Sequence, residues 1–538
     1  MRCRKKNIIT GMLFACIWLL FAIPVEVTAR NDIQQNTDRV QAYTIDGKWV
    51  KYPVSEGRPQ IPEKDKTKIV EIVFPNNVQE ISGCYFQDCK NLQMVTLSSG
   101  MEEIPWNAFT NCVNLKEVKI PEGIQVICMD AFDGCKSLKS VCLPKGLKYV
   151  YDNAFGDCEQ LKDVTILDSY TSISKNAFAN TPIMSEMWEQ AEGEYLIWNH
   201  ILFGTKTPLV DVVIPEGVTS IAGSAFESDG TIRSVIIPSS MKFIGSAAFW
   251  NTGLETVVIN GVEEIGANAF NETDIREITL PVGVKKIGNS AFLDCEKLTK
   301  VILPSGVEEI GEYAFFATGI GQITFPASVN KIGREAVAEC KNLKKVVIRN
   351  PKVQLTGLDK GDYYGQCTIL GMSTKRDWEM TPYYDKETTR IITVYGYRYS
   401  TAQELVERLK WTPRFYGCKS IRFKAIDSKT KNTTLESVKV PKTLTITEGK
   451  SKTIQVQLPK SIKKVTKFTK KKGQVKITYK VLDCSLLKVD KKGRVKVLSQ
   501  DSEVPEGFAT NRIYTTVTLP DGSRKVFTTK INVKPKKE

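Results

Sequence analysis

A repeat built around a phenylalanine, usually within an Ala-Phe pair, constrains the fold of this chain more than any other feature. Each copy also holds a strand pattern such as Leu115-x-x-Val118-x-Ile120, whose alternation places valine and isoleucine on one face. One copy cannot bury its apolar residues alone, so neighbouring copies must stack as a solenoid with a continuous parallel sheet. The markers are Phe86, Phe109, Phe132, Phe155 and Phe178, spaced by 23 residues, then Phe226, Phe249, Phe270, Phe292 and Phe315, with Val337 in the last copy.

Six cysteines share one position of the repeat, three residues after the phenylalanine or its substitute. Threonine takes the same position in other copies, as at Thr252 and Thr273, so the position requires a small, weakly polar side chain. Neighbouring copies would lie about 4.8 Å apart with parallel side chains, which suits a disulfide poorly. We expect buried free thiols, the alternative being the disulfide framework that an even number of cysteines indicates in an exported chain. The six are Cys89, Cys112, Cys135, Cys158, Cys295 and Cys340.

The Ala-Phe pairs, the Ile-Pro strand ends and the Ile-Gly turns resemble the BspA-like leucine-rich repeats of bacterial surface proteins. The resemblance covers residues 68–350. The segment Ile392–Tyr397, followed by a helix that begins near Ser400, resembles the usual end of such arrays, and Ser400 with Gln403 forms a capping box. The resemblance implies a leucine-rich-repeat solenoid with a parallel β-sheet, and a role in adhesion or in binding extracellular proteins or other cells.

Residues 1–29 predict a secretory signal peptide, with a basic start, an apolar run from Ile8 to Ile23 and a cut after Ala29. An uncleaved membrane anchor is the first alternative, because the run approaches spanning length, but Pro24 favours cleavage. Lipid attachment at Cys16 is the second, and the bulky Phe14 disfavours it. We expect a secreted or cell-surface protein with no membrane span after signal cleavage.

The remaining chain divides by composition into five segments. Residues 30–67 form an N-terminal cap that contains a hairpin around Asp46-Gly47, because a terminal repeat otherwise exposes an apolar face and unpaired strand edges. Residues 68–350 are the repeats, which the stretch from Met184 to Thr207 interrupts. Residues 351–426 close the solenoid, 427–435 are a linker, and 436–538 form a basic module.

The basic module predicts an all-β sandwich, because seven short stretches alternate apolar and polar residues between turns. The run from Tyr479 to Val495 is similar to bacterial Ig-like domains of group 2, so the resemblance implies an Ig-like fold. The module holds 25 Lys or Arg against 9 Asp or Glu, while the whole chain has a net charge of +15. The remainder of the chain is therefore close to neutral, and the basic module is a candidate spacer or surface tether.

No set of residues predicts catalysis, a metal site or a cofactor. His200 is the single histidine and lies in an apolar stretch that favours a local strand and a structural role. Cys128, Cys135 and Cys142 fall at three different positions of the repeat, which argues against a metal site. We therefore expect a protein that is not an enzyme, and an enzyme acting on glycans at the interruption is the least favoured class.

A binding surface is predicted on the outward face of the strands, at the position between the buried valine and isoleucine. An apolar stripe with a polar border is typical of a contact surface for protein or glycan. The alternative is that these residues are covered, or are β-branched because strands favour such side chains. The predicted surface comprises Val213, Ile236, Val258, Ile302 and Val347, with Lys300 and Lys345 at the border.

A lysine-rich run in the basic module is a second candidate surface. Nucleic acid is not expected as a partner, because the chain is exported and few aromatic residues interleave with the lysines. Anionic cell-wall polymers or sulfated glycans fit better, and a solvated face that keeps the protein soluble is the alternative. The basic patch comprises Lys463, Lys464, Lys467, Lys470, Lys471 and Lys472.

Two classes of function follow from the sequence. The first is an exported adhesion or ligand-binding protein, whose solenoid binds an extracellular protein or glycan. The second is a self-associating structural protein of the cell envelope that binds no foreign ligand.

Overall fold

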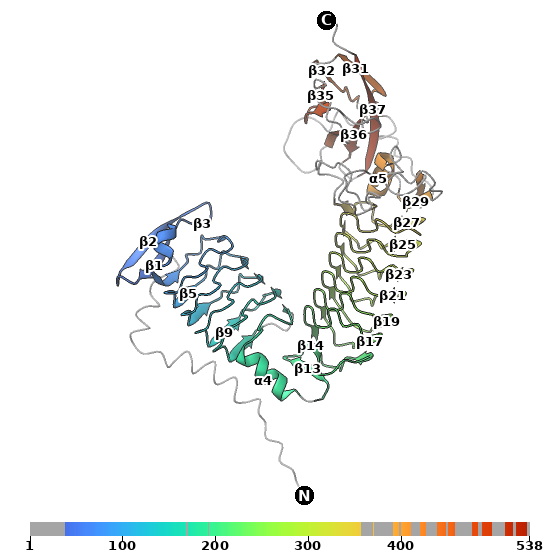
Figure 1. Ribbon diagram of the computed structural model, residues 1–538. Coiled ribbons are helices and arrows are strands. Elements are labelled where there is room, and N and C mark those ends of the chain that lie inside the picture. Colours follow the sequence, from blue (N-terminus) through green and yellow to red (C-terminus); the bar gives the residue numbers. More distant parts are fainter. Residues whose placement is uncertain are drawn as a thin grey trace. The chain divides into compact units, whose positions relative to one another are not determined.

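The computed structural model describes residues 38–167, 171–191, 193–356, 370, 391–397, 400–409, 420–426, 438–447, 450–457, 476–481, 487–497, 512–519 and 523–534. The chain divides into two compact units, residues 1–190 and residues 191–538 (Figure 1). The predicted signal peptide, the linker at 427–435 and the six lysines of the basic patch lie outside the described residues. Within the described part, no helix is both long enough and apolar enough to cross a membrane.

Unit 1 is a solenoid in which the copies stack through parallel strands. Each full copy gives a longer strand to one ladder and a two-residue strand to a second ladder, and register partners are equivalent residues such as Val95 and Val118. The first ladder contains β4 (Ile69–Val73), β5 (Met94–Thr96), β7 (Glu117–Lys119), β9 (Ser140–Leu143) and β11 (Asp163–Ile166). The second contains β6 (Glu103–Ile104), β8 (Val126–Ile127), β10 (Tyr149–Val150) and β12 (Ser172–Ile173).

The predicted N-terminal hairpin is confirmed. Strands β1 (Arg39–Thr44) and β2 (Trp49–Ser55) pair antiparallel, and Gly47 adopts φ +74° in the turn between them. β1 also pairs with β4, so the hairpin extends the sheet of the first copy and covers its edge. The short strand β3 (Arg58–Pro59) and the one-turn helix α3 (Glu63–Lys66) complete this end.

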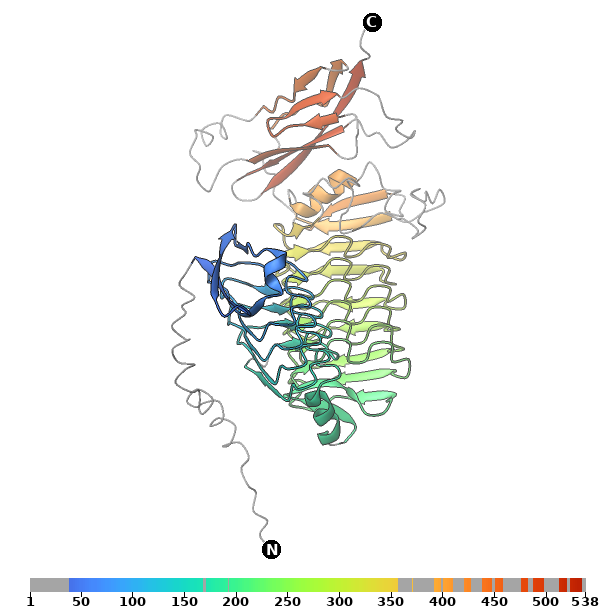
Figure 2. The same ribbon diagram turned by 60° about the vertical axis from the view of Figure 1, so that its left-hand side comes forward.

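Unit 2 repeats the arrangement, and Figure 2 shows its two ladders with copy stacked upon copy. The first ladder contains β15 (Asp211–Val213), β17 (Ser234–Ile237), β19 (Thr256–Ile259), β21 (Glu277–Thr279), β23 (Lys300–Ile302), β25 (Gln322–Phe325), β27 (Lys345–Ile348), β29 (Ile391–Gly396) and β30 (Ser420–Ala425). The second contains β16 (Ser220–Ile221), β18 (Phe243–Ile244), β20 (Glu264–Ile265), β22 (Lys286–Ile287), β24 (Glu309–Ile310), β26 (Lys331–Ile332) and β28 (Gln354–Leu355).

The expectation of one continuous parallel sheet is wrong for the first ladder. In unit 1 this ladder is interrupted between β7 and β9, and in unit 2 it separates into sheets β15-β17-β19, β21-β23 and β25-β27-β29-β30, whereas the second ladder of each unit stays continuous. Each break lies beside a strand of three residues, which is β7 in unit 1 and β21 or β23 in unit 2. Strand length alone does not explain the breaks, because the three-residue strands β5 and β7 pair with each other, and so do β21 and β23.

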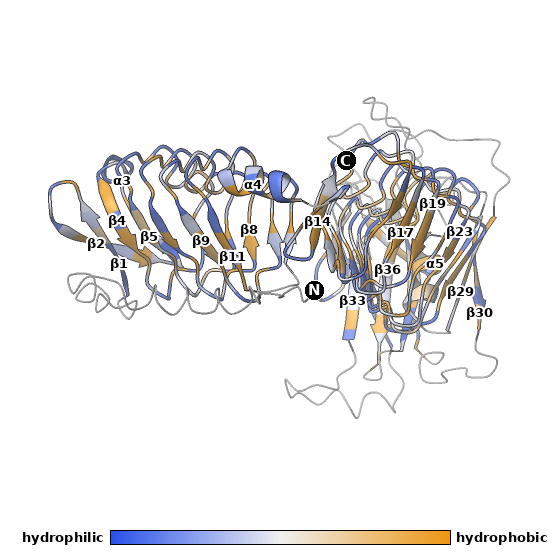
Figure 3. Cartoon of the chain, turned by 90° about the horizontal axis from the view of Figure 1, so that it is seen from below, coloured by the Kyte–Doolittle hydropathy of each residue, from blue (hydrophilic) through white to orange (hydrophobic). Residues whose placement is uncertain are grey.

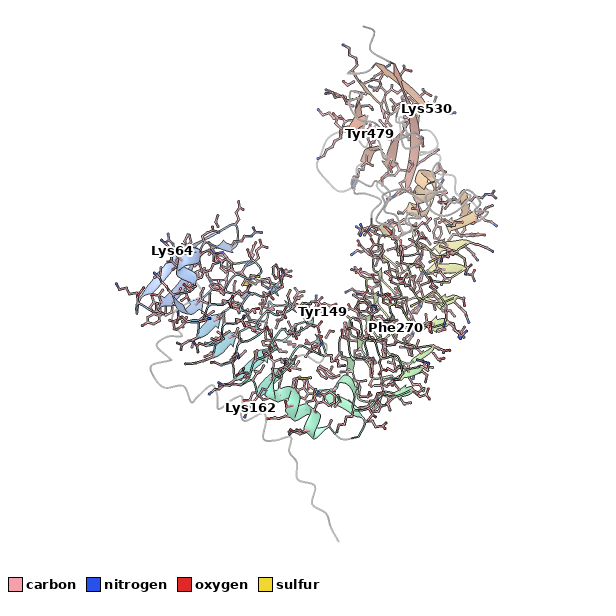
Figure 4. The ribbon with its side chains drawn as sticks, in the orientation of Figure 1. Lys64, Tyr149, Lys162, Phe270, Tyr479 and Lys530 are labelled. Atoms are coloured by element: carbon pink, nitrogen blue, oxygen red, sulfur yellow. The ribbon has the colours of Figure 1, made fainter. Side chains whose placement is uncertain are left out.

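The core between the two ladders is a column of phenylalanine rings. Successive rings from Phe86 to Phe178 and from Phe226 to Phe315 stack with centroids 5.2 to 5.5 Å apart and nearly parallel planes. Figure 4 labels Phe270, which lies inside the array of unit 2. The column is buried, since Phe132, Phe270 and their equivalents expose no more than a few per cent of their surface. The repeat therefore builds a core that one copy alone cannot form.

Left-handed backbone occurs two residues before and two residues after most of these phenylalanines. Around Phe109, for example, Asn107 has φ 54° and Asn111 has φ 58°. Asparagine and aspartate tolerate this conformation better than other non-glycine residues, which explains why they recur here. Ala317 occupies the second position with φ 53°, and its methyl group makes the conformation unfavourable.

Replacing Ala317 by glycine is expected to raise the free energy of unfolding by about 1 kcal/mol, because glycine adopts left-handed φ without steric cost. Chemical denaturation of the full chain measures the change. Ala314→Gly is the matched control: Ala314 is buried directly before Phe315 and has no left-handed φ, so this variant should be less stable than the parent. A loss of stability in both variants would contradict the proposed strain at Ala317.

The interruption of the repeats contains one helix and one hairpin. Helix α4 (Pro182–Gln190) closes unit 1, and strands β13 (Tyr195–Trp198) and β14 (Ile201–Thr205) open unit 2.

At the C-terminal end of the array, helix α5 (Thr401–Leu409) begins as predicted, and the Ser400 hydroxyl accepts a hydrogen bond from the backbone N–H of Gln403 at 3.4 Å.

The described part of the basic module contains two sheets. One has the order β31-β37-β36-β33 and the other β32-β35-β34. Residues of both sheets share one core, which includes Leu444, Val495 and Ile531. The strands are β31 (Thr443–Thr447), β32 (Ser451–Thr453), β33 (Lys476–Val481), β34 (Leu487–Val489), β35 (Arg494–Val497), β36 (Arg512–Thr518) and β37 (Arg524–Lys534).

Candidate binding surface

The outward face of the first ladder in unit 2 presents a row of apolar side chains. Val213, Ile236 and Val258 are register partners on β15, β17 and β19, and Ile302 on β23 has the same position in its copy. Their exposed fractions are 54%, 41%, 45% and 44%. Since every second residue of a strand faces outward, the inward-facing apolar residues beside them hold these four in place. We call Val213, Ile236, Val258 and Ile302 the apolar row.

Polar residues border and interrupt the apolar row. The Ser234 hydroxyl donates to the Asp211 carboxylate at 2.5 Å, and Lys300 Nζ lies 3.0 Å from the Glu277 carboxylate. Thr279 and Thr324 are exposed at the equivalent position of their copies. Figure 3 shows β17 and β19 largely in the hydrophobic colour, to which their inward-facing residues also contribute. The face thus combines apolar contact area with hydrogen-bonding groups, as contact surfaces on proteins do.

The prediction that Val347 is exposed in the same stripe is wrong. Val347 is only 9% exposed. Its register partner on the next strand is Tyr395, whose large side chain is directly beside the small valine. The last copies of the array therefore do not continue the apolar row, although Lys345 is exposed as predicted.

Unit 1 has a different outward row. Its equivalent residues are Thr96, Lys119, Cys142 and Thr165, all of them exposed or half-buried. Lys119 Nζ lies 3.7 Å from the carboxylate of Glu117 on its own strand. Because this row is polar, the candidate surface is confined to unit 2.

Sequence reasoning missed a cluster of cations around an aromatic ring on the same face of unit 2. Lys345 Nζ lies 5.4 Å from the centroid of the Tyr395 ring, and Lys424 Nζ lies 5.5 Å from it. Arg422 and Lys424 are two residues apart on β30 and both are exposed. The sequence did contain a signal for this cluster. The patterns Ile392-x-Val394 and Ile421-x-Phe423 alternate, so Tyr395, Arg422 and Lys424 are expected on the outward face. We call Lys345, Tyr395, Arg422 and Lys424 the cationic platform.

The repeat cysteines are free and buried, which confirms the expectation of unpaired thiols for the six that share one position. Cys295 Sγ donates to the carbonyl oxygen of Phe270 in the preceding copy at 3.0 Å, and Cys135 Sγ donates to that of Phe109 at 3.3 Å. The Thr273 hydroxyl donates to the Phe270 carbonyl of its own copy at 2.9 Å. Both residue types therefore donate a hydrogen bond to a buried carbonyl oxygen, which explains why the repeat position accepts either cysteine or threonine.

Burial should make these thiols unreactive in the folded protein. Loss of solvation raises the pKa of Cys89 and Cys295 to about 11 and that of Cys158 to about 12, so very little thiolate is present at pH 8. We expect iodoacetamide to modify the exposed Cys142 at least about 100-fold faster than Cys158. Peptide mass mapping after timed pulses measures both rates, and prior unfolding should make them similar. Equal rates in the folded protein would contradict the buried ladder.

His200 does not lie in a strand, contrary to the sequence expectation. It is exposed in the turn between β13 and β14, where Asn199 has φ 46° and His200 has φ 64°. Left-handed φ at both central residues is the geometry of a type I′ hairpin turn. The apolar residues on either side of this turn favoured a continuous strand in the sequence. The His200 Nδ1 atom lies 3.0 Å from the carbonyl oxygen of Gly217, so this contact ties the turn to the next copy.

Comparison with known proteins identifies the class of fold. A family model described as "BspA type Leucine rich repeat region (6 copies)" matches residues 64–184, 200–270 and 263–369, which together make up more than half of the chain. The stacked parallel strands from β4 to β28 and this match define a solenoid of the leucine-rich-repeat type. The chain belongs to the BspA-type leucine-rich-repeat family.

Several solved structures are similar to parts of the chain. A leucine-rich repeat protein from Bacteroides ovatus has 17% identity and a TM-score of 0.26, over 73% of this chain and 99% of that one. A leucine rich cell surface protein from Faecalibacterium prausnitzii has 22% identity and a TM-score of 0.24, over 59% and 88%. The pneumococcal vaccine antigen PcpA has 17% identity and a TM-score of 0.24, over 74% and 98%. No curated protein matches the sequence.

Proposed function

We propose that this protein is an exported, cell-surface binding protein without enzymatic activity, which uses the outward strand face of unit 2 to bind an extracellular protein or glycan. The apolar row carries the proposal. Four β-branched side chains on a regular sheet face are each 41% to 54% exposed, which is unfavourable unless a partner covers them. Family membership supports the surface location, because the resemblance to BspA-like repeats implies bacterial surface proteins, and the predicted signal peptide supports export.

The basic module is proposed to be an Ig-like domain of group 2 that serves as a spacer or surface tether. Its two sheets with a shared core support this assignment, together with the similarity of the run from Tyr479 to Val495. The proposed boundaries are 30–67 for the N-terminal cap, 68–350 for the repeats, 351–426 for the closing segment and 436–538 for the module. They follow from composition and from the repeat pattern.

The lysines of the basic patch at 463–472 are proposed to hold anionic cell-wall polymers. The module's excess of Lys and Arg supports this role, since a cationic run attracts polyanions at moderate ionic strength. No nucleic-acid partner is proposed.

A binding screen tests the main proposal. The mature protein is presented to extracellular matrix proteins and to glycans, and saturable binding to at least one of them is the expected result. Size-exclusion chromatography over a range of protein concentrations runs in parallel, because a self-associating envelope protein would form concentration-dependent oligomers instead. Oligomers without any saturable ligand would replace the proposed function with the structural one.

A further inference from the structure

The cationic platform occupies one end of the face that carries the apolar row. In the register of the sheet, Lys345 aligns with Thr393 and then with Arg422, and Tyr395 aligns with Lys424. Residues two apart on a strand share a face, so these cations point to the same side as Ile302 and its equivalents. Adjacent strands lie about 4.8 Å apart, and an extended partner that crosses the strands would therefore meet both surfaces.

Many exposed lysines elsewhere in the array are neutralised by a carboxylate of a neighbouring copy, whereas the described residues form no such pair at the platform. Among the described residues, Lys345, Arg422 and Lys424 have no Asp or Glu within ion-pair distance. Like charges held together on a surface repel one another, so an anionic partner would relieve this repulsion. The neutralised pairs of unit 2 include Lys242–Glu263 at 2.9 Å, Lys286–Glu264 at 2.7 Å, Lys297–Asp274 at 2.9 Å and Lys300–Glu277 at 3.0 Å.

Helix α5 covers the other face of the same strands. Its residues Ala402, Leu405 and Val406 are buried, as are Val394 of β29 and Ile421 of β30. A Cβ atom added at Gly396 of β29 would lie 2.6 Å from that of Ala402, which shows how closely the helix packs. The inner face of β29 and β30 is therefore part of the core, and the cationic platform lies on the outer face.

We propose that the partner of this face is a protein with an acidic segment, whose Asp or Glu carboxylates bind Lys345, Arg422 and Lys424 while its apolar side chains cover the apolar row. This inference rests on the proposed function and names the chemistry of the partner. It also gives the orientation of the partner on the face. The acidic segment lies over β27 to β30, because the opposite end of the face carries the Asp211 carboxylate on β15.

A protein fits the face better than an anionic polysaccharide does. The apolar row requires apolar side chains, which a sulfated or uronic-acid glycan lacks. The Tyr395 ring has an ammonium group within 5.5 Å of its centroid on each of two neighbouring strands, so it pairs with cations and is poorly placed to stack on a sugar. Carboxylates on a flexible segment can reach all three cations at once.

The test measures fluorescence anisotropy of a labelled peptide that has a run of glutamates followed by alternating valines and threonines. The full chain carries glutamine at the six lysines of the basic patch, so that this segment does not bind the probe. The platform variant is Lys345→Glu with Lys424→Glu. The matched control is Lys331→Glu with Lys341→Glu, which makes the same change of charge at exposed lysines outside the platform. A labelled heparin fragment is the second probe.

The peptide is expected to bind about tenfold more weakly to the platform variant and equally well to the control and the parent. No binding of the peptide to the parent, or equal weakening in both variants, overturns the inference. It is also overturned if heparin binds the platform more tightly than the peptide and is insensitive to Ile236→Glu with Ile302→Glu, because the partner is then a glycan. The screen could also find a partner whose binding requires the apolar row but not the platform. That result would leave the proposed function intact and overturn this inference alone.

Discussion

Replacing Phe132 by alanine is expected to lower the free energy of unfolding by roughly 3–5 kcal/mol. The ring is fully buried and stacks at 5.2 Å on both Phe109 and Phe155, so its removal leaves a cavity between two copies that cannot close without breaking the stack. The backbone of the turn depends on the same site, because the N–H of Phe132 donates to the carbonyl oxygen of Ala154 in the next copy. Urea denaturation followed by circular dichroism measures the change.

The control for this variant is Tyr151→Ala in the same unit. Tyr151 is 40% exposed, so losing its ring should cost less than about 1 kcal/mol. A Phe132→Ala protein whose unfolding midpoint matches that of Tyr151→Ala would show that the phenylalanine column does not hold the copies together.

Charging the apolar row with Ile236→Glu and Ile302→Glu is expected to weaken binding of the partner found in the screen by about 100-fold or more. Each glutamate would enter the interface without a matching cation, and an unpaired charge that loses its water is strongly unfavourable. Both isoleucines are more than 40% exposed, so the folded protein should keep its thermal stability. Surface plasmon resonance with the parent and the variant measures the loss.

The matched control is Ile197→Glu with Val282→Glu. Both residues are exposed apolar side chains of unit 2 outside the apolar row, at 37% and 77%. This variant carries the same added charge and should bind like the parent. Equal binding by the row variant and the parent would refute the proposed surface, whereas equal loss in both double variants would indicate a general charge effect.

Much of the solenoid could be predicted from the residues because its contacts repeat. Phe109 meets Phe132, and Phe132 meets Phe155, so one pattern found in one copy applies to all of them. The exchange of cysteine and threonine at one position predicted free thiols, and Cys135 is such a thiol. The strict alternation within strands also placed Ile236 and Ile302 on the outward face, where they lie.

Predictions failed where a residue depends on a neighbour that breaks the period. Val347 follows the repeat pattern, but its next strand is β29, which brings Tyr395 instead of another small side chain. His200 lies in an apolar stretch, yet two left-handed residues turn that stretch into a hairpin. The breaks in the first ladder lie between copies whose strands alternate in the same way, so alternation alone does not predict them.

The Ile-Gly turns also combine a feature that the sequence shows with a reason that only the structure gives. The motif marked the turn in the sequence, but only the structure gives its reason: a Cβ atom at Gly311 would lie 2.4 Å from the backbone carbonyl carbon of Gly288 in the preceding copy. The two backbones therefore touch at this turn, and no side chain fits between them.

The sequence by itself determined the repeat, its buried faces and the outward position of the apolar row, because these follow from local alternation and from the need of each copy for a neighbour. The tertiary structure alone decided the cationic platform. Lys345, Tyr395 and Lys424 are far apart along the chain and share no motif, and they meet only because β29 and β30 add to the sheet after the last repeat. Contacts between strands outside the repeat depend on which strand docks next, and a periodic pattern does not encode that choice.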